Sequence, residues 1–277
     1  EFFPESAAQV ADPRKAQITI RHMLQMRTGY PDEETDSAYL DALYWGEYLP
    51  LVVDFPLVSD PGTQFHYSNL TYSWLAIMLH RACGTDLKTY AQEHLFQPLD
   101  TEVGEWLQDR DGYYIGSGGI HITARDAAKF GWLYLNDGYY EGDQIVPVDW
   151  VQDSLQTYSV NEAFVKRVGD FRDIGYGYQW WSANAGNYHV NFAWGHGGQL
   201  IVLVEDLTQS SAGTGAAIAT TSLPAFLGSL VSGAVIDRWG RVPADLEGAV
   251  RLLEVQPPGG RAMTFEAYRN GHDAMAR

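Results

Sequence analysis

A tyrosine and an asparagine two residues apart stand where the sequence predicts the start of a helix. Tyr67 and Asn69 follow a turn at Pro61-Gly62, and Leu70 begins an apolar pattern with helical spacing. A phenol held at a helix start next to cationic groups ionises at a lower free-energy cost, so it can take a proton from a nucleophilic hydroxyl and later return it. Asn69 is the expected N-cap and can also point its amide toward a substrate. The alternative that stays open is a chance tripeptide in which the asparagine only caps the helix.

A histidine flanked by glycines precedes an apolar, strand-like run. Gly195, Gly197 and Gly198 leave the main chain around His196 free of side chains, so a ligand can approach the backbone closely. The N–H of Gln199 is a candidate oxyanion donor, and the strand that follows, expected at a sheet edge, can pair with an extended substrate. A β-bulge with a histidine that has no catalytic role is the alternative interpretation.

Other patterns for nucleophiles and metals fail on spacing. None of the four lysines has a serine three positions before it, so the chain contains no Ser-x-x-Lys. Ser117 does not complete a Gly-x-Ser-x-Gly elbow, because Ile115 stands where the first glycine is needed. The eight histidines include no His-Glu-x-x-His, and there is one cysteine. We therefore expect no metal site and no cofactor.

Composition limits the possible partners. The chain has 277 residues, is 45% hydrophobic, and carries 18 Lys and Arg against 35 Asp and Glu. This length and apolar content predict a globular core, and the acidic balance argues against nucleic acid or an anionic membrane as a partner. No run of apolar residues is long enough for a membrane segment. Cys83 is expected in the core, and its solitary presence is compatible with the cytoplasm and with a periplasmic or extracellular location.

Helical periodicity dominates the first half of the chain, and strand-like residue patterns dominate the second half. The predicted helices cover about residues 19–28, 69–84, 85–96, 123–135 and 149–155. The predicted strands cover 176–181, 188–194, 200–205 and 216–221, and a helix near 225–239 is expected to pack on their sheet.

These patterns divide the chain into three parts. Residues 1–155 form a mostly helical region that carries Tyr67-Ser68-Asn69. Residues 156–240 form an antiparallel sheet with its packing helix and carry His196-Gly197-Gly198, and residues 241–277 form a linker and a tail.

Five segments in the same order resemble the class C β-lactamase-like serine hydrolases. This family includes penicillin-binding proteins, family VIII esterases, D-aminopeptidases, DD-peptidases and 6-aminohexanoate-dimer hydrolase. The five segments are Ile18 to Gly29, Pro61 to Asn69, Gly118 to Phe130, Tyr176 to Trp181 and Gly195 to Gln199.

The resemblance implies an α+β fold, in which an antiparallel sheet is flanked by helices beside a mostly helical subdomain. It implies an acyl-enzyme mechanism with Tyr67 as general acid and base and with Asn69 orienting the substrate. His196 stands where true lactamases carry lysine, and the N–H of Gln199 would be half of the oxyanion hole. Because histidine weakens the fixed charge that binds a β-lactam carboxylate, we expect an uncharged small-molecule ester or amide as substrate.

The family places its Ser-x-x-Lys helix, and the strands before it, ahead of a segment that Glu1 to Glu5 resemble. We therefore expect an N-terminally truncated fragment that is inactive alone. The alternative function is a non-catalytic binding or scaffold module that keeps the cleft and has lost the nucleophile.

Overall fold

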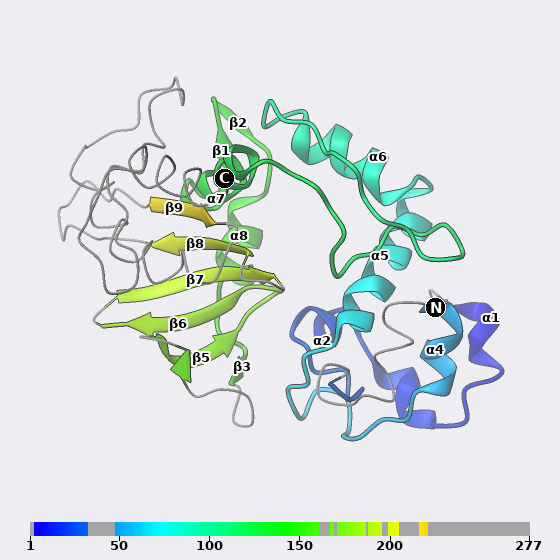
Figure 1. Ribbon diagram of the computed structural model, residues 1–277. Helices are drawn as coiled ribbons and strands as arrows, with labels where there is room; N and C mark the ends of the chain where they lie inside the picture. Colours follow the sequence, from blue (N-terminus) through cyan, green and yellow to red (C-terminus); the bar gives the residue numbers. More distant parts are fainter. Residues whose placement is uncertain are drawn as a thin grey trace, which may run out of the picture.

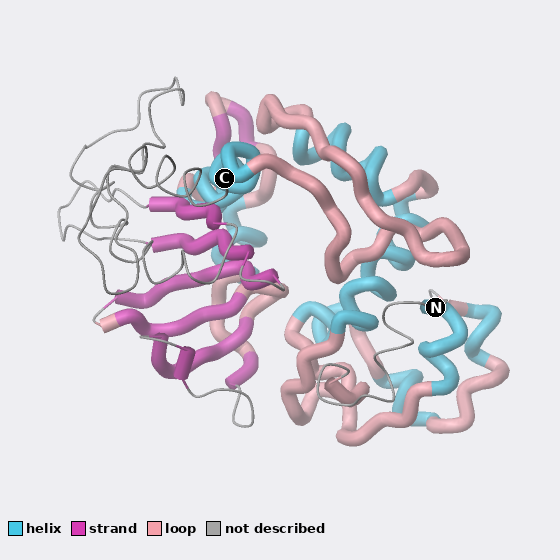
Figure 2. The backbone as a smooth tube through the Cα atoms, viewed as in Figure 1, coloured by secondary structure: helices cyan, strands magenta, loops and turns pink. Residues whose placement is uncertain are grey.

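The protein consists of a helical part and a sheet, which lie side by side in Figure 1. This computed structural model describes residues 3–32, 48–160, 167–168, 171–186, 188–195, 199–204 and 216–220. Helices joined by long loops make up the helical part (Figure 2), which has the lower residue numbers (Figure 1). The strands follow later in the chain, as the change of sequence pattern predicts.

The helices are short except for two. They are α1 (Pro4–Ala7), the 3-10 helix η1 (Pro13–Gln17), α2 (Ile20–Leu24), α4 (Tyr48–Asp54), α5 (Asn69–Cys83), α6 (Leu87–Ala91), the π-helical η2 (Gln92–Phe96), α7 (Ala124–Leu135) and α8 (Val148–Ser154). Within the described ranges, no helix has the length and apolarity needed to cross a bilayer.

The described strands form a small hairpin and one large antiparallel sheet. The hairpin is β1 (Tyr139–Tyr140) with β2 (Asp143–Gln144). The large sheet contains β3 (Ser159–Val160), β4 (Arg167–Val168), β5 (Phe171–Tyr176), β6 (Trp181–Ala185), β7 (Tyr188–Gly195), β8 (Gln199–Val204) and β9 (Ala216–Thr220). Its order is β3-β5-β6-β7-β8-β9, with β4 also paired to β5. From β4 onward, sequential strands are therefore neighbours, as short antiparallel connections require.

The two long helices begin at side-chain caps. The hydroxyl oxygen of Thr123 accepts the N–H of Asp126 at 3.1 Å, which confirms the capping pattern expected for α7. At α5 the cap is Ser68, whose hydroxyl accepts the N–H of Thr71 at 3.1 Å. The prediction that Asn69 is the N-cap is wrong by one residue, because Asn69 already has helical geometry.

The sheet buries both of its faces, which alternate along each strand. On one face Tyr134 of α7 and Val151 of α8 pack with Leu203 of β8 and with Trp180, which directly precedes β6. The opposite face holds the largest aromatic cluster and faces residues of the helical part. Its buried members are Met26, Phe171, Ile174, Tyr176, Trp181, Ala183, Val190, Phe192 and Val202.

Two further expectations are wrong. The run 176–181 is not one strand, because β5 ends at Tyr176, β6 begins at Trp181, and Gln179 between them has a positive φ of 64°. Cys83 is exposed at the end of α5 rather than in the core. The predicted helix 225–239 and the tail 241–277 lie outside the described residues.

Candidate active site

Tyr67 lies at the junction between the helical part and the sheet. Its ring centroid is 5.4 Å from that of Trp181 on β6 and 6.3 Å from that of Tyr176 on β5. Phe65, two residues earlier, contacts the same two rings at 5.9 and 5.3 Å. The segment before α5 is thus anchored on the aromatic face of the sheet, which fixes where the phenol of Tyr67 lies.

The same aromatic cluster reaches the end of β7. The ring of Trp194 lies 6.0 Å from that of Trp181, and Tyr67 and Trp194 both pack against the cluster. Trp194 is followed by Gly195, whose partner across the β7 and β8 pair is Gln199. The structure therefore brings the start of α5 and the β7–β8 connection to one cluster, with Trp181 between them.

The centre of that connection is not described. His196, Gly197 and Gly198 lie outside the described residues, and of Gln199 only the backbone pairing is known. One expectation about the strand after them is wrong. Over 200–204, β8 is paired with β7 on one side and with β9 on the other, so it is not an edge strand.

A loop-to-loop ladder holds the segment that leads into Tyr67. The N–H of His66 donates to the carbonyl of Met26 at 2.9 Å, and the N–H of Gly62 donates to the carbonyl of Arg27 at 2.7 Å. Met26 is fully buried in the aromatic cluster of the sheet and has a positive φ of 54°. Its backbone and its side chain therefore connect the two parts of the site.

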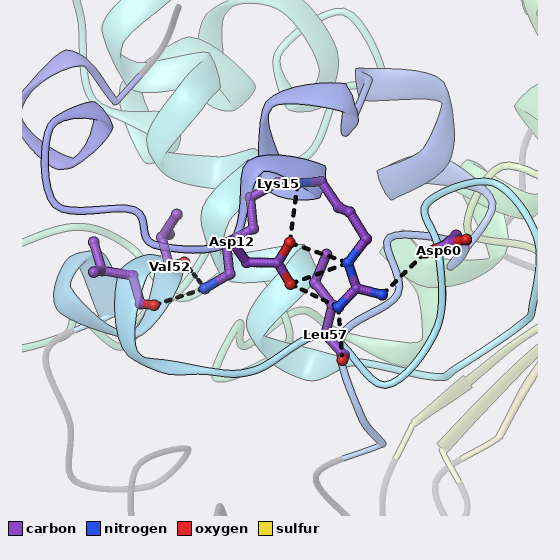
Figure 3. A network of polar contacts seen from close by, with 7 residues as sticks. Asp12, Lys15, Val52, Leu57 and Asp60 are labelled. Atoms are coloured by element: carbon purple, nitrogen blue, oxygen red, sulfur yellow. Dashed lines mark hydrogen bonds and ion pairs between the residues drawn. The ribbon is translucent and has the colours of Figure 1, made fainter.

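A polar network fixes the beginning of the same loop (Figure 3). The guanidinium of Arg14 donates to Asp60 at 2.9 Å and to the carbonyl of Leu57 at 3.3 Å, while Asp12 accepts from it at 2.6 Å. The Nζ of Lys15 donates to the carbonyls of Val52 and of residue 53 at 2.8 and 2.6 Å. Contacts from the η1 segment thus fix the position of the chain that precedes Pro61-Gly62.

The start of α5 places a second phenol beside Tyr67. With Ser68 as N-cap, Tyr67 occupies the position before the cap and Tyr72 the fourth helical position. Side chains at these two positions commonly pack on each other at helix starts. Their ring centroids are 5.9 Å apart. The Tyr72 hydroxyl in turn forms a short hydrogen bond with that of Tyr176.

Burial sets the charge states around Tyr67. It raises the pKa of Tyr72 and of Tyr176 well above the usual phenol value, so both are neutral at physiological pH. It lowers the pKa of His66, whose buried Nε2 has no hydrogen-bond partner within the described part of the chain. The ring next to Tyr67 in sequence is therefore a neutral imidazole near pH 7.

Sequence reasoning missed part of this arrangement. Tyr72 and Met26 are not among the residues that the sequence indicates, and Trp181 is indicated only as one of several aromatic residues, one or two of which could line a pocket. The helix-start geometry of Ser68 is the signal that identifies Tyr72, because it fixes the position that packs on Tyr67. Nothing in the residue type of Met26 indicates that it belongs to the site. Among the described residues, no group of His, Cys, Asp or Glu is suited to hold a metal ion.

Comparison with known proteins identifies the family of the chain. The family model described as Beta-lactamase matches residues 2–226. The chain belongs to the beta-lactamase family. Among curated relatives, it is 29% identical over 131 residues to 6-aminohexanoate-dimer hydrolase from Paenarthrobacter ureafaciens, a match that covers 45% of this chain and 33% of that protein. The chain thus spans about a third of the length of the curated relatives it matches.

Solved structures of family members share the fold. A penicillin-binding protein from Bacillus halodurans is similar with a TM-score of 0.52 and 19% identity, over 83% of this chain and 79% of that one. The octameric penicillin-binding protein homologue from Pyrococcus abyssi is similar with a TM-score of 0.53 and 17% identity, over 84% and 65%. At these identities the likeness establishes the α+β architecture of the beta-lactamase family.

Proposed function

We propose that the whole protein is a serine hydrolase of ester or amide substrates that works through an acyl-enzyme. Tyr67 is its general acid and base, Asn69 orients the substrate, and His196 takes the place that lysine has in true lactamases. The N–H of Gln199 is half of the oxyanion hole, and Gly197 and Gly198 let the substrate approach the backbone. A small uncharged acyl compound is the substrate class.

One observation carries this proposal. The ring of Trp181 contacts that of Tyr67 at 5.4 Å and that of Trp194 at 6.0 Å, and Trp194 comes two residues before His196. Two segments that are distant in sequence therefore meet at one aromatic cluster. The match to a protein named as a hydrolase of the 6-aminohexanoate dimer also supports amide or ester chemistry.

The nucleophile in this proposal is a serine in a Ser-x-x-Lys helix, a pattern that these 277 residues do not contain. The chain alone is then inactive, and the reading frame upstream supplies the helix. The test is to extend that frame, identify Ser-x-x-Lys, and follow p-nitrophenyl ester hydrolysis by the longer protein. The proposal expects a burst of p-nitrophenol and then steady turnover. The absence of both a burst and steady turnover would contradict the proposal.

The missing motif also favours a second candidate function, a non-catalytic binding or scaffold module. An upstream region without Ser-x-x-Lys, together with saturable binding of a peptide ligand by the full-length protein, would favour that module over the hydrolase.

A further inference from the structure

Three phenols that come from distant parts of the chain meet next to the proposed acid and base. Tyr67 precedes α5, Tyr72 lies in its first turns, and Tyr176 ends β5. Their ring centroids are separated by 5.9 Å for Tyr67 and Tyr72 and by 6.3 Å for Tyr67 and Tyr176. Tyr72 forms hydrogen bonds with both of the other side chains. Tyr72 is thus the middle member of a chain of three hydroxyls.

The donor capacity of these hydroxyls limits how they can be arranged. Each phenol has one O–H to donate and can accept further hydrogen bonds on its oxygen. Tyr176 has no exposed surface, and the burial of Tyr72 and Tyr176 keeps both protonated near neutral pH. Neutral buried phenols retain their O–H and need an acceptor, because an unpaired buried donor is costly. A phenolate oxygen on Tyr67 would be the strongest acceptor of the three.

We propose that Tyr176 and Tyr72 form a chain of neutral donors that positions Tyr67 and stabilises its phenolate: when Tyr67 is ionised, Tyr176 donates to Tyr72 and Tyr72 donates to Tyr67. Tyr72 and Tyr176 are positioning residues in this arrangement. The catalytic consequence rests on the role of Tyr67 as general base under the proposed function.

The ring of Tyr67 contacts those of two titratable groups, Tyr72 and Tyr176, and also that of Trp181. His66 is its neighbour in the chain and is held neutral by burial. Because Tyr72→Phe keeps the ring and removes only the hydroxyl, a change in the ionisation of Tyr67 in this variant reports on the hydrogen bond that this hydroxyl makes.

The test measures the ionisation of Tyr67 directly. The full-length protein is labelled with tyrosine carrying ¹³C at Cζ, and the Tyr67 resonance is assigned by its loss in Tyr67→Phe. Its titration is followed from about pH 7 to pH 11 in the wild type, Tyr72→Phe and Tyr176→Phe. We expect a midpoint at least about one pH unit higher in Tyr72→Phe, since one pH unit corresponds to about 1.4 kcal/mol and a hydrogen bond to a charged group contributes about that much or more, and a smaller rise in Tyr176→Phe.

Tyr30→Phe is the matched control. Tyr30 is also a buried phenol, but its hydroxyl donates to the carbonyl of Val52 at 2.7 Å, so its loss should leave the Tyr67 midpoint unchanged. An unchanged or lower midpoint in Tyr72→Phe, or a wild-type Tyr67 that does not titrate in this range, would overturn the proposal. If Tyr72→Phe does not fold, Tyr176→Phe decides in the same way.

Ester hydrolysis by the same full-length variants separates this inference from the proposed function. The hydroxyl chain predicts a lower kcat in Tyr72→Phe, with an alkaline shift of its pH profile and little change in KM. A Tyr67 midpoint that shifts as expected in a protein without any turnover would contradict the hydrolase and leave the hydroxyl chain supported.

Discussion

The ring of Tyr67 lies 5.4 Å from that of Trp181, and the two rings are inclined by 31°. One residue precedes the longest described helix and the other begins a central strand of the sheet. Through this contact the helical part and the sheet share one aromatic cluster, on which Trp194 also packs. The cluster therefore joins the two segments of the candidate site.

Removing Trp181 should cost a large part of the stability of the protein. Trp181 is 4% exposed and contacts the rings of Tyr67, Tyr176 and Trp194. Trp181→Ala is expected to lower the free energy of unfolding by about 3–5 kcal/mol, because a large cavity is left among these rings. Urea denaturation measures it. Trp150, which is 44% exposed on α8, is the control, and its change to alanine should cost less than about 1 kcal/mol. Equal losses in the two variants would contradict this account.

A side chain at Gly29 should disturb the loop that leads to Tyr67. Gly29 has φ +90°, and a Cβ there would lie 2.4 Å from the carbonyl oxygen of Ser59. Gly29→Ala is expected to cost about 2 kcal/mol or more, because backbone strain and a clash with main-chain atoms add up. At Gly84, φ is +68° but the space is open, so Gly84→Ala should cost only about 1 kcal/mol. Thermal melting compares the stability of the two variants. A smaller loss of stability in Gly29→Ala than in Gly84→Ala would contradict the predicted clash.

Lys129 is a buried cation whose role is structural. It is 8% exposed, and its Nζ donates to the carbonyls of Leu99 and Asp100 at 3.0 and 2.6 Å. Lys129→Met leaves these carbonyls without their donor and should lower stability by about 2–3 kcal/mol. Lys88 makes a single exposed bond to the carbonyl of Gly104 at 2.7 Å, so Lys88→Met should cost less than about 1 kcal/mol. Chemical denaturation measures the free energy of unfolding of both variants. A larger loss in Lys88→Met than in Lys129→Met would contradict this prediction.

Stability should fall as the pH is lowered below neutral. Burial lowers the pKa of His66, and burial with the nearby Arg27 lowers that of His22. In the unfolded chain both histidines bind a proton near pH 6.5, so below that value unfolding takes up protons and the folded state loses stability. The free energy of unfolding, measured between about pH 5.5 and pH 7.5, should fall less steeply in His66→Gln than in the wild type. A slope in His66→Gln equal to that of the wild type would show that His66 is not involved.

The sequence predicted the elements whose signals are local. Thr123 caps α7 because its hydroxyl and the N–H three residues later are fixed by chain geometry, and the runs that became β7, β8 and β9 are bounded by turn residues. The break between β5 and β6 escaped prediction, since Gln179 adopts a positive φ that its residue type does not favour.

The site was predictable only in part for a related reason. Tyr67 follows from its helix start, but its partners Trp181 and Tyr176 are brought to it by strand pairing far along the chain. Met26 joins them through a backbone conformation with φ 54° and a buried side chain, neither of which a single sequence reveals. Contacts between distant segments depend on tertiary packing, so local patterns do not specify them.

The most direct test of the central claim is the rate of ester hydrolysis by the full-length protein with Tyr67→Phe. Phenylalanine keeps the ring that packs on Trp181 and removes the hydroxyl that would move the proton. We expect kcat/KM to fall about 10²–10⁴-fold while the unfolding midpoint stays close to that of Tyr30→Phe. Wild-type rates in Tyr67→Phe would contradict the account.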